Sequence, residues 1–358
     1  MFSTSPISFK QVILDGYILP SQSILGTAPK MLLLFTTAFC PAFKLAYYSI
    51  YVIPFCDYST KVSTFECIYI DLVVTMLSLE VLMVLFGFDL DYFKKLISTI
   101  TLLSIEIDSS AVRTIKRNRL SNRIMLVITF ICRIIFRSIN LLTNIRNLGK
   151  SRVIVLIFTE FFITFGLFFL LNMICNICVC LQVAFNQINS RIAALTETTK
   201  QLASSFEEIR NLRHNYSYAV RSTQHAEKLF RCFITLFYIE YFTYNIMNVV
   251  KLFGPRTKID PIYFIYMFTQ TLQLLILTYN LVLVNNLSRQ GLEDLYEFSF
   301  KLNSLHLYHE NDIFIARMAL SDVGFTFANL FTINNSFITS LLTLSLTIIL
   351  TLASFLYQ

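Results

Sequence analysis

The chain has 358 residues, of which 55% are hydrophobic and only 14% are charged, and phenylalanine alone contributes 35. A soluble domain cannot cover that much apolar surface, so the composition excludes a soluble globular protein and indicates a polytopic membrane protein. The net charge is +7, and the basic residues lie mostly between hydrophobic segments. This distribution indicates membrane topology rather than nucleic-acid binding.

Seven hydrophobic segments follow one another, and we expect an all-α fold in which each crosses the membrane as a helix. No repeat or change in composition divides them, so residues 1–358 are expected to form a single seven-helix membrane domain. The segments cover residues 31–55, 62–88, 123–142, 153–185, 229–253, 262–287 and 337–357.

The connections between these segments differ in charge and in length. Those on the side of the N-terminus carry 18 lysines and arginines, against 7 on the opposite side. The positive-inside rule therefore predicts a cytosolic N-terminus and an extracellular C-terminus, the inverse of a G-protein-coupled receptor. Residues 186–228 and 288–322 are rich in helix-forming residues, so we expect cytosolic helical extensions that pack into an anchor region. The alternative is that they are solvated linkers.

The last segment carries a continuous line of hydroxyl and amide side chains on an otherwise apolar helix. At about 100° per residue these side chains fall within about 80° of one another, and we call them the polar seam. Close packing of transmembrane helices is one explanation, because small hydroxyl residues let backbones approach. A water-filled pore lined by the polar seam is the other. The seam consists of Ser336, Ser340, Thr343, Thr347, Thr351, Ser354 and Gln358.

The run FTFANLFTINNSFITS, residues 325–340, resembles the C-terminal signature of insect gustatory receptors, F-T-A-x-G-F-F-T-I-D-x-S-L-L-x-S. Asn329 stands where the family has Gly, and Asn334 stands where it has Asp. The matching residues are Phe325, Thr326, Phe331, Thr332, Ile333, Ser336 and Ser340.

The family's following motif, T-Y-x5-Q-F, falls without a gap on TIILTLASF, which begins at Thr347. Its Thr and its final Phe, Phe355, are retained, while Ile348 replaces Tyr and Ser354 replaces Gln. A second register retains Gln358 but requires four inserted residues, about one helical turn. We prefer the ungapped register.

The resemblance implies a gustatory receptor in the plasma membrane that acts as a ligand-gated, non-selective cation channel. It implies a homo- or heterotetramer in which each subunit contributes its last helix to a central pore. It also implies a gate near the outer end, at Ser354, Phe355 and Gln358. The alternatives are an odorant receptor of the same superfamily, a seven-span G-protein-coupled receptor and a transporter.

A pocket for a small polar tastant needs a few hydrogen-bonding groups among aromatic walls. We expect it on the outer side of the bundle, although tyrosines at a membrane interface are an equally good explanation for any single aromatic residue. Charged residues inside the segments have a competing explanation as intramembrane ion pairs, for example Lys44 or Arg133 with one of the acids. The acids inside the segments are Glu66, Asp71, Glu80, Glu160 and Glu240. The pocket candidates are Glu66, Asp71, Tyr241, Tyr244, Tyr266, Gln270 and Gln273.

The sequence contains no catalytic constellation, Gly-rich phosphate loop or nucleophile elbow. We therefore expect no enzymatic activity and no cofactor. His306 and His309 with Glu310 have a weak metal-like spacing, but a polar linker explains it better, so we expect no metal site.

Overall fold

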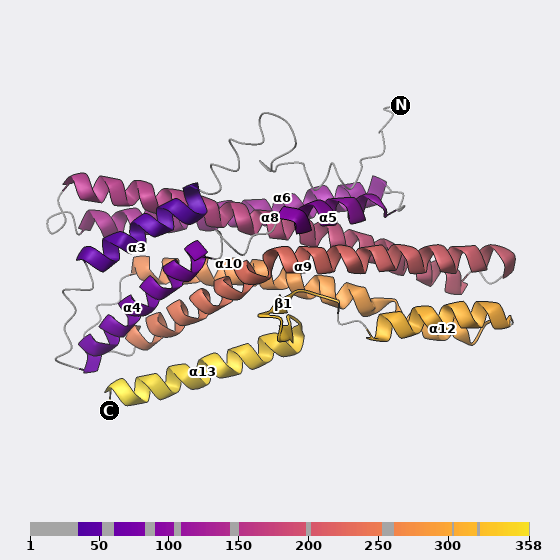
Figure 1. Cartoon of the computed structure of the whole chain (residues 1–358). Coiled ribbons are helices and arrows are strands. Elements are labelled where there is room, and N and C mark those ends of the chain that lie inside the picture. Colours follow the sequence, from indigo (N-terminus) through magenta and orange to yellow (C-terminus); the bar gives the residue numbers. More distant parts are fainter. Residues whose placement is uncertain are drawn as a thin grey trace, which may run out of the picture.

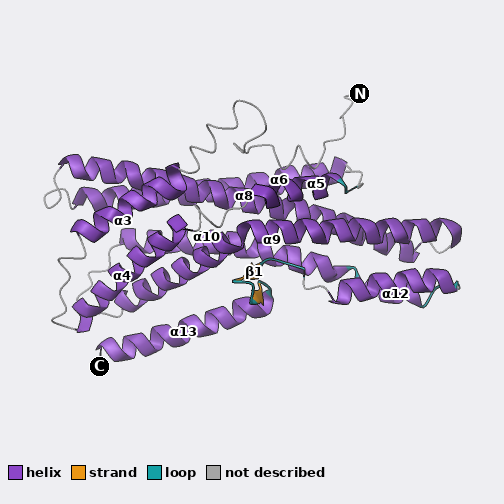
Figure 2. Ribbon diagram, in the orientation of Figure 1, coloured by secondary structure: helices purple, strands orange, loops and turns teal. Residues whose placement is uncertain are grey.

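The computed structural model describes residues 35–51, 61–82, 90–103, 109–143, 150–197, 202–252, 261–302, 304–320 and 323–357. These residues are almost entirely helical (Figures 1 and 2), which confirms the predicted all-α class. The elements are η2 Phe35–Phe39, α3 Cys40–Tyr51, α4 Lys61–Leu82, α5 Leu90–Thr101, α6 Ser109–Thr143, α8 Lys150–Glu197, α9 Leu202–Leu252, α10 Pro261–Gln290, α11 Leu292–Ser299, α12 Leu305–Leu320, β1 Thr326–Phe327, β2 Phe331–Thr332 and α13 Asn335–Tyr357.

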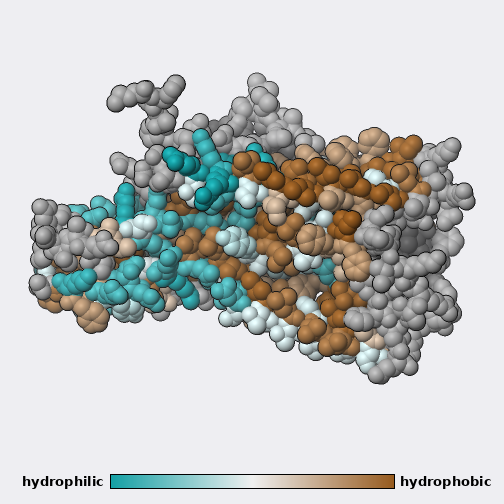
Figure 3. All heavy atoms as spheres, turned by 180° about the vertical axis from the view of Figure 1, so that it is seen from behind, coloured by the Kyte–Doolittle hydropathy of each residue, from teal (hydrophilic) through white to brown (hydrophobic). Residues whose placement is uncertain are grey.

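Two helices are far longer than a membrane is thick. Helices α8 and α9 have 48 and 51 residues, which at about 1.5 Å per residue exceeds twice the roughly 30 Å of a bilayer core. Within the described residues, three helices are long and apolar enough to cross a membrane, namely Val153–Leu195, Met267–Ser299 and Asn335–Phe355. On the face of the molecule that Figure 3 shows, hydrophilic residues gather toward one end and apolar residues toward the other.

The main hydrophobic core lies where α8, α9 and α10 pack against one another. Every residue of α8 from Leu170 to Phe185 is buried, and amide side chains connect the helices across this core. Asn280 of α10 accepts a hydrogen bond from Asn122 of α6, and its backbone carbonyl accepts one from Gln182 of α8. These contacts satisfy polar groups in an apolar interior, and they fix how the long helices align.

The helix α5 lies between the second and third predicted spans, where the sequence suggested only a loop. Leu96 and Ile100 are buried against α9, while Lys94 and Lys95 are exposed. An amphipathic helix of this kind covers one side of the long α9 helix.

A short hairpin, β1–β2, precedes α13 and packs on α9. Its turn holds Ala328 and Asn329 at φ angles of 51° and 60°, in the left-handed region where Gly and Asn are most readily accommodated. This explains why the related signature has Gly at the position of Asn329. Asn334 then caps α13, because its Oδ1 accepts a hydrogen bond from the Phe337 backbone N–H at 2.9 Å.

Candidate pore helix and ligand site

Among the residues that the structure describes, helix α13 packs against the rest of the chain along one face. Near its start, Phe337, Ile338 and Leu341 pack against the main core. Farther along, Ile348, Ile349 and Leu352 pack against a small cluster formed by Phe65 of α4 with Ile246 and Val250 of α9. These contacts hold the helix beside α9, as Figure 1 shows.

The polar seam lies on the other side of α13. At about 100° per residue, its centre is roughly 140° around the helix from the centre of the contact face. It is bordered by exposed apolar residues, with Leu346 and Leu350 on one side and Leu344 and Phe355 on the other. Gln358 lies outside the described residues, and the exposed members of the seam are Ser336, Ser340, Thr343, Thr347, Thr351 and Ser354.

The threonine hydroxyls of the seam have a defined orientation. Those of Thr343, Thr347 and Thr351 donate to the carbonyl four residues earlier, at 2.9, 2.9 and 2.8 Å. Because each proton is used inside the helix, the lone pairs of each oxygen are left to accept from outside. The seam is therefore a line of neutral oxygen acceptors.

The residues of the expected gate are at the free end of α13. Ser354 belongs to the seam and is exposed, and Phe355 is exposed about 100° away from it. The side chain of Phe355 therefore lies beside the seam rather than on it, and some rotation of the helix is required to bring it onto the same line.

Buried and half-buried polar residues from five helices lie at one level of the bundle, which we call the outer polar layer. Each lies about 10–18 Å along its helix from the end predicted to be extracellular, at about 1.5 Å per residue. The layer consists of Lys44 of α3, Arg133 and Arg137 of α6, Glu160 of α8, Tyr241 and Tyr244 of α9, and Gln270 and Gln273 of α10.

Direct contacts connect these helices within the layer. The Lys44 Nζ lies 2.7 Å from Glu160 Oε1, and both side chains are only 10% exposed. This ion pair confirms the predicted pairing of intramembrane charges. Arg137 Nη2 donates to the Tyr244 hydroxyl at 3.1 Å, a contact that the sequence did not predict because it joins residues far apart in the chain.

The amide side chains of α10 extend the layer. Gln273 Nε2 donates to Thr129 Oγ1 of α6 at 3.1 Å, and Gln270 is also buried. The buried Tyr241 hydroxyl faces Asn245 and Thr271, but it forms no hydrogen bond of normal geometry. The layer thus retains unused hydrogen-bonding capacity.

The outer polar layer contains four of the seven residues predicted for the ligand pocket, namely Tyr241, Tyr244, Gln270 and Gln273. Asp71 is exposed at the surface of the subunit on α4, so it does not belong to this buried layer. Glu66 and Tyr266 belong to α4 and α10, but their side chains lie outside the described part of the structure.

Helix α9 lies between the outer polar layer and α13. Tyr241 and Tyr244 face the layer, whereas Ile246 and Val250 contact α13. At about 100° per residue, the centres of these two faces are roughly 170° apart. Any rotation or shift of α9 that starts at the outer polar layer would therefore also move the α9 residues that pack against α13.

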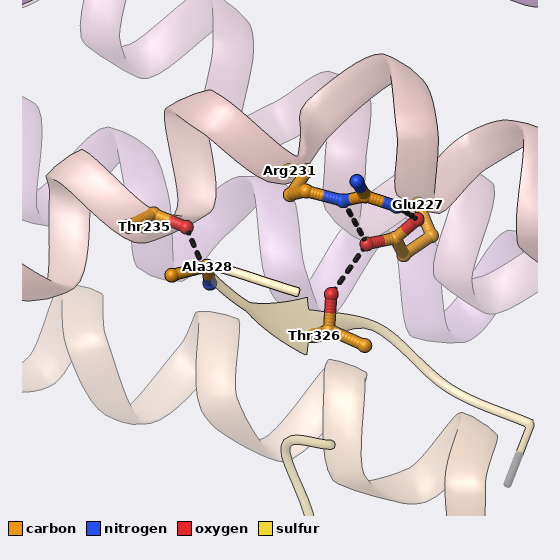
Figure 4. A network of polar contacts seen from close by, with 5 residues as sticks. All are labelled: Glu227, Arg231, Thr235, Thr326 and Ala328. Atoms are coloured by element: carbon orange, nitrogen blue, oxygen red, sulfur yellow. Dashed lines mark hydrogen bonds and ion pairs between the residues drawn. The ribbon is translucent and has the colours of Figure 1, made fainter. Parts of the chain in front are cut away.

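A second connection between α9 and α13 runs through the hairpin (Figure 4). Arg231 holds the Glu227 carboxylate through two hydrogen bonds of 2.6 and 2.7 Å, and Thr326 of β1 donates to the same carboxylate. The Ala328 backbone N–H donates to Thr235 Oγ1 at 2.9 Å. These contacts attach the hairpin to α9 at two levels.

Comparisons with known proteins identify the fold. No family model matches the chain, and no curated protein matches it. Among solved structures, the olfactory receptor OR5 of the insect Machilis hrabei in complex with eugenol matches with a TM-score of 0.70 and 11% identity, over 97% of this chain and 96% of that one. A second structure of the same receptor matches with a TM-score of 0.64 and 13% identity, over 96% of each chain. The chain therefore has the same fold as this olfactory receptor, which fits a polytopic seven-helix membrane protein.

Proposed function

We propose that this chain is a chemosensory receptor subunit of the insect chemoreceptor superfamily that acts as a ligand-gated, non-selective cation channel in the plasma membrane. The observation that carries the proposal is the polar seam, which lies on the face of α13 that its own subunit leaves uncovered. Four subunits arranged around an axis would turn four such seams toward one another. Their apolar borders would then pack against neighbouring helices.

The chemistry of the seam favours cations. A cation entering a pore must exchange part of its hydration shell for oxygen ligands, and the seam offers hydroxyl oxygens whose protons are already donated to the backbone. None of its residues carries a charge, so we expect weak selectivity among cations. Ser354, Phe355 and Gln358 remain our candidates for the gate.

The outer polar layer is our candidate for the ligand site, and α9 is our candidate for the link to the pore. One OR5 structure contains eugenol, a small aromatic molecule, and the layer likewise combines aromatic rings with hydrogen-bonding groups. Binding there would move α9, and α9 would move α13 through the packing at Ile246 and through the hairpin. This is consistent with the general rule that a ligand shifts a conformational equilibrium only when it binds the two conformations with different affinities.

The pore assignment is tested by removing one hydroxyl at a time without changing side-chain volume. We expect Thr347→Val to reduce single-channel conductance, because it removes an oxygen from the seam. Thr339→Val is the matched control, because Thr339 is exposed on α13 and donates to the backbone in the same way but lies off the seam. Equal effects of the two variants would contradict the proposal, as would unchanged conductance in both.

A gustatory and an odorant role differ in the ligand. The C-terminal signature supports a gustatory receptor, while the likeness to OR5 supports an odorant receptor equally well. Currents from cells expressing the chain, recorded against sugars, bitter compounds and volatile odorants, distinguish them. A soluble, non-volatile agonist supports a taste receptor, and an exclusive response to volatile compounds contradicts it.

A further inference from the structure

We propose that the outer polar layer binds a ligand with an anionic group, such as a carboxylate, and that Arg133 is the residue that receives it. This inference deepens the proposed function, because it names the class of ligand for the candidate ligand site. The central observation is that Arg133 is buried at this level without any hydrogen bond or ion pair in the described part of the structure.

The burial of Arg133 is pronounced. The residue as a whole is only 8% exposed, and its Nε is buried without a hydrogen-bond partner. A guanidinium inside a membrane bundle is costly unless it is paired, so such residues generally mark functional positions.

The nearest compensating carboxylate is shared among three cations. Glu160 interacts electrostatically with Arg133 and Arg137, but its Oε1 contacts Lys44 at 2.7 Å and its Oε2 forms no hydrogen bond. The described side chains of the layer thus contain three cationic groups and one carboxylate. Asp71 and Glu240 do not change this balance, because both are exposed. A ligand that supplies one negative charge would reduce the excess.

More than half of the buried polar atoms without a hydrogen-bond partner in the described residues lie at or near the level of Arg133. Seven of the twelve buried side-chain atoms without a partner in the described residues belong to the layer or to residues within one turn of it. They include donors as well as acceptors, so the remainder of a polar ligand could also be bound. The seven atoms are in Arg133, Arg137, Glu160, Thr164, Tyr241, Asn245 and Asn248.

Aromatic rings beside the arginines suit an apolar ligand body. Phe130 lies three residues before Arg133 on α6, and its ring packs against Phe161 and Phe168 of α8 with centroids 5.9 and 5.5 Å apart. Phe237 stacks on Tyr241 of α9 at 6.3 Å. We therefore expect a small carboxylate or other organic anion with an aromatic or alkyl body.

The test compares probes of equal size that differ in charge. 3-Phenylpropanoate is compared with 3-phenylpropanamide and 3-phenylpropanol, both in whole-cell currents and in thermal unfolding of the purified protein. We expect the carboxylate to be effective at a concentration about tenfold or more below that of the amide, which corresponds to one charge-assisted contact. Equal potency of the carboxylate and the amide would overturn the proposal.

The variant Arg133→Met separates a ligand contact from a structural role. We expect it to raise the effective carboxylate concentration by about tenfold or more while shifting that of the amide by less than about twofold. In the absence of ligand it should unfold no earlier than the wild type, because it removes an unpaired buried charge. Arg133→Lys should retain part of the preference, and Arg123→Met, at an exposed position on the same helix, should change nothing. Premature unfolding of Arg133→Met together with an unchanged carboxylate preference would contradict the role of Arg133.

The two readouts keep this inference separate from the proposed function. Carboxylate binding that depends on Arg133 but produces no current would refute the channel and support the anion site. Currents activated only by neutral probes would refute the anion site and support the channel.

The anion could also be a lipid headgroup. Nanodiscs of phosphatidylcholine alone are therefore compared with nanodiscs that also contain phosphatidylglycerol. Weaker carboxylate binding in the second, with no such difference between the two nanodiscs for Arg133→Met, would identify an anionic lipid as the occupant. Equal binding in both would identify a soluble ligand.

Discussion

Single buried charges determine much of how the outer half of the bundle is held together. The Lys44–Glu160 ion pair joins the first described helix to α8, and both residues are removed from water. A buried pair of this kind contributes little by itself, but removing one member leaves the other charge uncompensated.

We therefore expect Glu160→Gln to destabilise the protein by about 3 kcal/mol. The measurement is thermal unfolding of the detergent-solubilised protein, followed by size-exclusion chromatography of the heated samples. Asp91→Asn is the control, because it breaks the Lys94–Asp91 pair, whose side chains are 78% and 68% exposed, and such pairs contribute less than about 1 kcal/mol. A Glu160→Gln variant as stable as Asp91→Asn would show that Lys44 has another source of compensation.

The hairpin turn contains a residue in an unfavourable backbone conformation. Ala328 has a φ of 51°, which costs a residue with a Cβ atom about 1 kcal/mol relative to Gly. We expect Ala328→Gly to raise the free energy of unfolding by up to about that amount. Asn329→Gly should have a smaller effect, because Asn adopts this conformation readily. A destabilised Ala328→Gly variant would show that the Ala methyl makes a contact that outweighs the strain.

At the scale of elements, the relation between α9 and α13 is what connects the two candidate sites. The packing at Ile246 and Val250 is apolar and lies near the outer end, while the Glu227 network lies near the hairpin. If α9 transmits ligand binding, weakening either attachment should reduce activation without altering the pore itself.

We expect Glu227→Gln to lower the maximal ligand-evoked current per surface receptor and to leave the reversal potential unchanged. The reason is that Gln cannot hold Arg231 through two charge-assisted hydrogen bonds, so the hairpin is held less firmly. Glu207→Gln, at an exposed position on the same helix, is the control. A changed reversal potential would place the effect in the permeation pathway instead.

At the scale of the whole molecule, the sequence predicted the helical class and the polar seam because both depend on local periodicity. It also suggested that Lys44 pairs with an acid inside the spans, because a charged residue in an apolar helix needs a partner, but it did not identify Glu160 as that acid. It could not predict the contact of Arg137 with Tyr244, or that Asp71 is exposed, because these depend on how distant helices pack. The hairpin was missed because two strands of two residues each leave almost no alternating pattern.

The orientation of the chain in the membrane remains a prediction from its charges. We expect an epitope attached to the C-terminus to be labelled by antibody on intact cells, and one attached to the N-terminus to be labelled only after permeabilisation. An N-terminal epitope accessible on intact cells would contradict the cytosolic N-terminus and would favour a G-protein-coupled arrangement.

The central claim is that the polar seam of α13 lines the ion pathway, and cysteine accessibility at two adjacent positions tests it most directly. Thr347 lies on the seam, and Leu346 is also exposed on α13 but about 100° away. We predict that a membrane-impermeant, positively charged thiol reagent applied from outside during activation blocks most of the current of Thr347→Cys. The same reagent should leave the currents of Leu346→Cys and the wild type unchanged. Block of Leu346→Cys with no effect on Thr347→Cys would contradict the account.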